Sequence, residues 1–209
     1  MSLKRFTLLA EGSSDESLIP ILLWLWRQHR PADELVVPQF ADAEYLDIAS
    51  HRLVDRVQPA CDLYPCDVLF IHRDADSELP AAREKEIRDA VTRAFSNKSA
   101  PSAVCVIPVR TMEAWLLFHE SALRKAAGNP NGNNHLAMPK LSRIESLPKP
   151  KQTLRKLLIE ASGLPPNRLR RFSEAGAVRL VTLFIEDFSP LRKLSAFRRL
   201  EAEFESLTF

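Results

Sequence analysis

The stretch "CDVLFIHRDAD", residues 66–76, joins a continuous apolar run to two closely spaced aspartates. An unbroken run such as Val68 to Ile71 is typical of a strand that is buried on both faces of a parallel sheet. Because successive side chains of an extended chain point to opposite faces, Asp74 and Asp76 are expected on the same side. The stretch therefore predicts a central parallel strand with a pair of carboxylates at its end.

Strands and helices are predicted to alternate on both sides of this stretch. Apolar runs rich in β-branched residues and amphipathic periodicity distinguish the two kinds of element. The predicted strands cover residues 4–12, 34–40, 68–72 and 102–109, and the predicted helices cover 13–30, 46–64 and 79–95. This β-α-β-α-β-α-β order predicts an α/β fold with a mainly parallel sheet flanked by helices.

The first predicted helix follows the sequence "AEGSSDE", residues 10–16. Ser13 and Glu16 have the spacing of a capping box, in which both side chains satisfy free backbone amides. Pro20 should kink the helix or move its start toward Ser17. The following "ILLWLW" is apolar on nearly every face, which indicates a buried helix or a surface for a partner, including a second copy of the chain.

The pattern changes after Val109. A short helix is predicted at 110–119, a loop rich in Gly, Asn and Pro at 126–140, and helices at 151–162, 174–188 and 190–207. We interpret residues 1–119 as an α/β domain, 120–139 as a loop or linker, and 140–209 as a C-terminal helical extension packed on the domain.

The net charge of +2 conceals an asymmetry along the chain. Residues 1–139 carry 15 Lys and Arg against 19 Asp and Glu, whereas residues 140–209 carry 14 against 8. The basic part could attract a nucleic acid or could form solvated helix faces, and both interpretations stay open.

No apolar run approaches the roughly 20 residues of a membrane span, and the N-terminus lacks signal-peptide features. We expect a cytoplasmic protein without a membrane partner.

Acidic residues follow three of the predicted strands. Glu11 ends the first, Asp74 and Asp76 end the third, and Glu113 follows the last by a few residues. Ligands of open α/β sheets bind at the carboxyl ends of the strands. Carboxylates that are forced together repel unless a cation lies between them, and oxygen ligands favour Mg²⁺ or Mn²⁺. Such ions promote phosphodiester cleavage, so the pattern indicates metal-assisted hydrolysis.

The segments "AEGSSDE" (10–16), "FIHRDAD" (70–76) and "RTMEAWLL" (110–117), in this order, resemble the motifs of the TOPRIM superfamily. The resemblance covers residues 4–119 and is greatest to compact TOPRIM proteins of bacterial defence, including the nuclease domain of the OLD (overcoming lysogenisation defect) family. It implies a TOPRIM-like, Rossmann-like sheet and a Mg²⁺- or Mn²⁺-dependent nuclease that acts on DNA or RNA. It also implies a role in anti-phage defence beside an ATPase partner.

The resemblance also implies roles for individual residues. The implied metal ligands are Glu11, Asp15, Asp74, Asp76 and Glu113. All of these except Asp15 are expected to act in catalysis. Arg73, Thr111 and Lys151 are the expected phosphate contacts. OLD-type enzymes use a later lysine, for which Lys149, Lys151 and Lys156 all stay open.

Structural roles compete with these assignments. Asp15 suits the first turn of a helix, Asp76 suits an N-cap, and Glu113 could pair with Arg110 on its own helix. Two other functions also stay open. One is a non-catalytic TOPRIM-like subunit that binds nucleic acid or regulates an ATPase. The other is a phosphotransfer domain, which would need adjacent acids after the first strand and a lysine after a later one, and the sequence offers neither.

Overall fold

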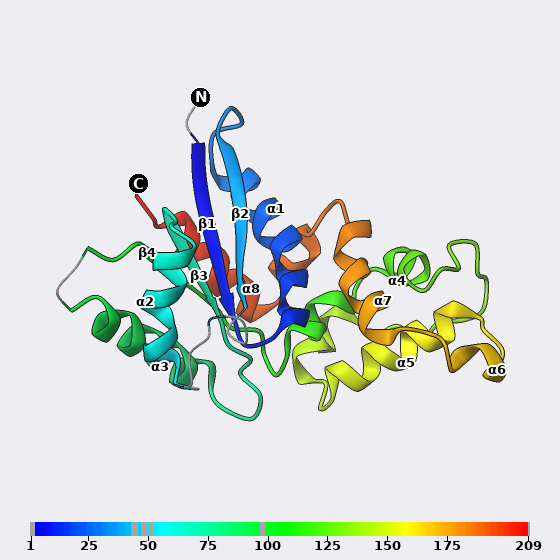
Figure 1. The fold of residues 1–209 in the computed structure, drawn as a ribbon. Coiled ribbons are helices and arrows are strands. Elements are labelled where there is room, and N and C mark those ends of the chain that lie inside the picture. Colours follow the sequence, from blue (N-terminus) through cyan, green and yellow to red (C-terminus); the bar gives the residue numbers. More distant parts are fainter. Residues whose placement is uncertain (1–2, 43–45, 47–49, 51, 97–98, 209) are drawn as a thin grey trace.

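The computed structural model describes residues 3–42, 46, 50, 52–96 and 99–208 (Figure 1). Its centre is a parallel sheet of four strands with the order β2-β1-β3-β4. The strands are β1 (Leu3–Ala10), β2 (Leu35–Asp42), β3 (Val68–His72) and β4 (Ser102–Val106). The predicted α/β fold with a parallel, helix-flanked sheet is confirmed. β2 carries Pro38 and lies at the edge of the sheet, where the missing amide of proline is tolerated.

Helices cover both faces of the sheet (Figure 1). In β1, Phe6 and Leu8 point into the core formed with α1 (Ile19–His29) and α8 (Ser195–Glu205). Leu9 points to the opposite core, formed with α2 (Leu53–Leu63) and α3 (Pro80–Ala94). This alternation buries β1 on both sides, as its apolar sequence predicts. The predicted helix at 46–64 is observed from Leu53, and residues 47–49 and 51 lie outside the described residues.

The connection from β1 to α1 differs from the prediction in its cap. The chain first forms a 3₁₀ turn, η1 (Ser13–Leu18), and the α-helix begins at Ile19, so Pro20 lies in its first turn as expected. The predicted box of Ser13 and Glu16 is wrong. Gly12 is the extended N-cap residue, and its amide donates to Asp15 Oδ2 at 3.2 Å. The turn begins one residue earlier than the sequence preference suggested, so Asp15 takes the position that had been assigned to Glu16.

The apolar helix α1 is covered by its own chain. Trp26 is buried and lies 5.3 Å from Phe204 of α8, between ring centroids. Trp24 is 6.2 Å from Phe197 of the same helix. The "ILLWLW" segment therefore contributes to the core of the chain, so the alternative of a partner surface on this helix is not needed.

Short helices follow the sheet. They are η2 (Met112–Leu116), α4 (Glu120–Ala126), η3 (Leu141–Ser146), α5 (Pro150–Ser162), α6 (Pro166–Leu169), α7 (Glu174–Val181), η4 (Thr182–Phe184) and η5 (Ser189–Lys193). α4 lies inside the predicted linker. Helices α4 to α7 form a group to one side of the sheet, and α8 returns to the sheet (Figure 1).

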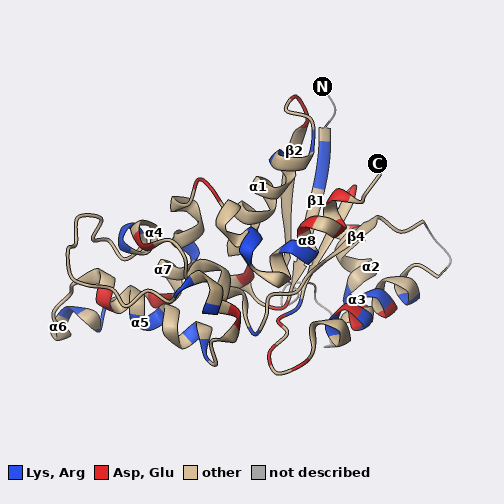
Figure 2. Ribbon diagram, turned by 180° about the vertical axis from the view of Figure 1, so that it is seen from behind, with Lys and Arg blue, Asp and Glu red and all other residues tan. Residues whose placement is uncertain are grey.

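Basic residues occur on α5 and α8, and also on α3, where they alternate with acids (Figure 2). The positive charge is therefore spread over several elements. None of the helices in the described part of the chain is both long and apolar enough to cross a lipid bilayer.

Candidate carboxylate site at the sheet edge

The carboxyl ends of β1 and β3 are neighbours at the centre of the sheet. β2 lies on one side of β1, whereas β3 and β4 lie on the other, so the strand order reverses between β1 and β3. Open α/β sheets bind ligands in the crevice beside such a reversal. Glu11 leaves β1 and Asp74 leaves β3 at this point, which places the predicted acids where the topology favours a ligand.

His72, the last residue of β3, lies between two carboxylates. Its side chain is only 2% exposed, and its Nδ1 donates to the carbonyl oxygen of Val106 at 3.0 Å. A carbonyl can only accept, so Nδ1 carries a hydrogen. Nε2 lies 3.4 Å from Asp74 Oδ1 and 3.9 Å from Asp15 Oδ1. The sequence indicated a buried strand residue and not this central position between the acids.

Asp74 is held by hydrogen bonds from two other elements. Its Oδ1 accepts from the amide of Met112 at 2.9 Å, and its carbonyl oxygen accepts from Arg83 Nε at 3.1 Å. Arg83 was not singled out from the sequence, although it lies in the first turn of the helix that follows the two aspartates. These bonds fix Asp74 at the crevice independently of its charge.

Burial and the neighbouring acids raise the pKa of Asp74. Burial is the main cause that raises its pKa from 3.8 to about 7, while His72 acts in the opposite direction. The charges of Glu113, Asp15 and Asp76 raise the pKa further. The carboxyl therefore titrates near neutral pH, and a cation beside it would favour the charged form. The structure brings these four predicted acids close enough to repel.

Glu113 reaches this group from η2. Its side chain is 7% exposed and its Oε1 lies 3.7 Å from Lys151 Nζ, so it pairs with α5 and not with Arg110. Of the three lysines left open by the sequence, Lys151 is the one beside an acid of the site, whereas Lys156 pairs with Glu160. The hydroxyl oxygen of Thr111, just before η2, is buried without a hydrogen-bond partner among the described residues.

The side chain of Glu11 points toward the guanidinium group of Arg73. Its carboxylate forms an ion pair with Arg73, and Arg73 Nη2 lies 3.1 Å from Glu86. The register explains this contact, because Leu9 pairs with Ile71 and two further residues along each parallel strand lead to Glu11 and Arg73. Glu11 and Arg73 thus meet as a consequence of the sheet, and Arg73 balances the charge of Glu11.

Asp76 has an unusual backbone conformation. Asp76 and Arg110 both have left-handed conformations, with φ of 52° and 63°, and the amide of Asp76 donates to the Arg110 carbonyl at 2.8 Å. Such conformations in residues other than glycine cost free energy and concentrate at functional sites. The exposed Asp76 carboxylate lies 3.8 Å from Arg83 Nη2. The competing N-cap role is not observed, since α3 is preceded by Leu79 at that position.

The acids are gathered without being assembled into a ready ligand set. Within the described residues, no group of three or more His, Cys, Asp or Glu side chains is arranged to hold a metal ion. The donor types nevertheless suit a hard divalent cation, because carboxylates predominate and the Thr111 hydroxyl oxygen lacks a partner. Binding an ion would require the side chains to draw together.

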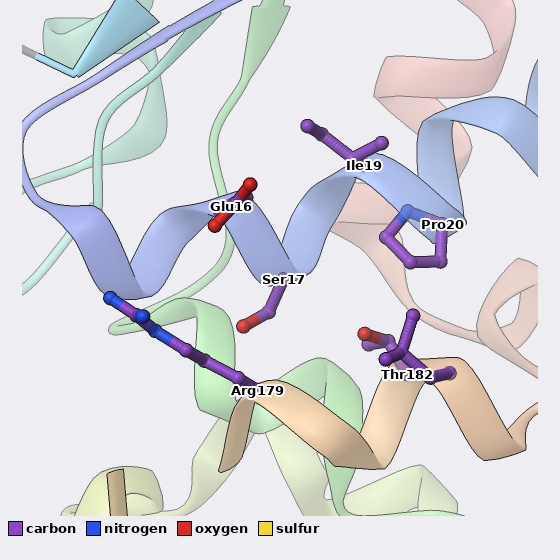
Figure 3. Close-up of a pocket in the computed structure, with 7 residues that line it drawn as sticks. Glu16, Ser17, Ile19, Pro20, Arg179 and Thr182 are labelled. Atoms are coloured by element: carbon purple, nitrogen blue, oxygen red, sulfur yellow. The ribbon is translucent and has the colours of Figure 1, made fainter. Parts of the chain in front are cut away.

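Glu16, next to Asp15, lies apart from this group. It lines a pocket of about 270 Å³ with Ser17, Ile19 and Pro20 on one side and Arg179 and Thr182 on the other (Figure 3). This position agrees with the omission of Glu16 from the predicted ligands.

The fold and the site define an α/β protein with a Rossmann-like parallel sheet, whose acidic residues gather where the strand order reverses. No family model matches the chain, and neither a curated protein nor a solved structure shows significant similarity to it.

Proposed function

We propose that this protein is a Mg²⁺- or Mn²⁺-dependent nuclease of TOPRIM type that hydrolyses phosphodiester bonds in DNA or RNA. One observation supports the proposal most strongly, the mutual repulsion at Asp74. The fold partly buries Asp74 and surrounds it with Asp15, Asp76 and Glu113, and so disfavours the charged state of this carboxyl. A divalent cation would relieve that repulsion.

Asp15, Asp74 and Glu113 are the acids that would hold the ion, with Glu11 and Asp76 at the edge of the group. When bound, such an ion supplies an activated water and stabilises the departing oxygen. His72 Nε2 lies 3.4 Å from Asp74 Oδ1, beside the carboxyl that would bind the ion. Lys151 beside Glu113 and Arg73 beside Glu11 provide positive charge for substrate phosphates.

The test is cleavage of supercoiled plasmid, single-stranded circular DNA and an oligoribonucleotide in Mn²⁺ or Mg²⁺. Wild-type protein should cleave at least one substrate, EDTA should stop the reaction, and Asp74→Ala should abolish it. Asp89→Ala is the matched control, because Asp89 is a carboxylate of α3 that is paired with Lys85 and is not among the acids that act on Asp74. Equal cleavage by wild type and Asp74→Ala would overturn the proposal.

A second candidate function is a non-catalytic TOPRIM-like subunit that binds nucleic acid or regulates an ATPase. The absence of a ready ligand set among the described residues favours it. If wild type and Asp74→Ala both bind nucleic acid in Mn²⁺ and neither cleaves it, this candidate would be supported. An ATPase partner and a role in anti-phage defence are implied by the resemblance and belong to the same proposals, together with a cytoplasmic location. Homodimerisation stays a prediction, although α1, the helix that suggested it, packs against α8.

A further inference from the structure

A cleft of about 260 Å³ opens beside the carboxylate site. It is lined by Ser14, Glu113, Lys151, Arg155, Glu174 and Val178, with Ala175 completing its apolar side. Glu113 belongs both to the cleft and to the group around Asp74, so the cleft leads to the acids. Its volume lies just below the roughly 300–1,000 Å³ of ordinary ligand pockets, which suits a small occupant.

Two cations of α5 face this cleft. Lys151 and Arg155 are four residues apart and therefore lie on one side of the helix. Lys151 lies near Glu113, and Arg155 forms an ion pair with Glu174. Both cations are more than half exposed, so these ion pairs contribute little to stability and can exchange for a phosphate. Ala175 and Val178 offer an apolar surface on the opposite helix, α7.

The acids at the end of the cleft are recessed. The side chains of Glu113, Asp15 and Asp74 are 7%, 13% and 26% exposed. In a duplex, a base can enter a pocket of this size only after it is unpaired and flipped out of the stack, which costs a few kcal/mol. A single strand can direct one phosphate inward while its base leaves the stack.

We propose that this cleft binds one nucleotide of a single-stranded polynucleotide. Lys151 and Arg155 hold its phosphate, and Val178 contacts its sugar or base. The protein thus selects single strands over duplexes. This inference rests on the proposed function for the role of the neighbouring acids, but the binding itself requires no metal ion.

Fluorescence anisotropy in EDTA tests the inference. The probes are a short fluorescein-labelled oligodeoxynucleotide, its duplex, and an oligoribonucleotide of the same sequence. The proteins are wild type, Lys151→Gln, Arg155→Gln and the control Lys156→Gln. Lys156 is on the same helix but pairs with Glu160 and does not line the cleft. Thermal unfolding of each variant checks that it is folded.

The single strands should bind at least about tenfold more tightly than the duplex. Each cleft variant should weaken single-strand binding about three- to tenfold and reduce the salt dependence by roughly one phosphate contact. Lys156→Gln should leave the affinity within about twofold of wild type, since its ammonium lies outside the cleft. The DNA and RNA probes show which sugar the cleft accepts.

Duplex binding that equals single-strand binding, cleft variants that behave like Lys156→Gln, or no single-strand binding would each overturn the inference. These outcomes are separable from failure of the nuclease proposal. Asp74-dependent cleavage of duplex plasmid would retain the nuclease and exclude the single-strand selection. Binding of single strands that depends on Lys151 and Arg155, without any cleavage, would retain the single-strand selection and exclude the nuclease.

Discussion

Replacing Asp74 with asparagine should stabilise the protein at alkaline pH. Asparagine keeps the oxygen that accepts from the Met112 amide but removes the charge that burial and the neighbouring acids disfavour. Moving the pKa of a carboxyl from 3.8 to about 7 corresponds to roughly 4 kcal/mol. Because the Asp74 side chain is 26% exposed, water screens part of this energy and we expect about 2 kcal/mol.

The sign follows from proton linkage. The folded protein binds the Asp74 proton more tightly than the unfolded chain does, so its stability falls as the pH rises from about 4 to about 7. The stabilisation by Asp74→Asn should therefore be roughly two fifths of its full value at pH 5 and complete at pH 8. In a chain of this length, about 2 kcal/mol raises the melting temperature by roughly 4–8 °C.

Thermal unfolding by circular dichroism in EDTA at pH 5 and pH 8 measures this difference. Asp89→Asn should show no comparable gain, because its exposed carboxylate is paired with Lys85. Adding Mn²⁺ at pH 8 should raise the melting temperature of wild type more than that of Asp74→Asn. An asparagine variant that is no more stable than wild type at pH 8, or equally stabilised at both pH values, would refute the reasoning.

Two further predictions concern the support of the sheet by α8. Phe204→Ala should cost about 3–5 kcal/mol, because the ring is fully buried against Phe70 and Trp26, and urea denaturation should show the loss. Glu145→Ala should cost about 1–2 kcal/mol, because Glu145 accepts from the amides of Ser195 and Ala196 at the start of α8. Glu145→Gln should retain part of that stability, and an unchanged denaturation midpoint in Glu145→Ala would contradict the capping role.

The sheet could be predicted from the sequence because its signals are local. The apolar run at Val68 to Ile71 and the similar run around Val104 are both buried strands, as continuous hydrophobicity indicates. The placement of β3 next to β1 could not be predicted in this way, since it depends on which helices cover each face of the sheet. The meeting of Glu11 with Arg73 follows from that order and from the strand register, neither of which the sequence states.

The candidate site shows the same division. That Asp74, Asp76 and Glu113 would approach one another followed from the acids at strand ends, whereas Asp15 was included because of the resemblance. Long-range polar contacts could not be predicted in this way. The hydrogen bond from His72 to Val106 and the bond from Arg83 to the Asp74 carbonyl depend on backbone atoms, which have no side-chain signal in the sequence. The cap of η1 was missed for a smaller reason, a shift of one residue in the start of the turn.

Three separate elements hold Asp74 in its partly buried position, so this position is a property of the fold. β4 orients His72 beside it, η2 donates an amide to its carboxyl, and α3 holds its carbonyl through Arg83. These elements fix the position of a group whose charge the same surroundings disfavour. Proteins tolerate such local conflict mainly where function requires it. A cation at this edge would convert the repulsion into binding energy, so the same residues that weaken the fold at alkaline pH would give it affinity for a divalent ion.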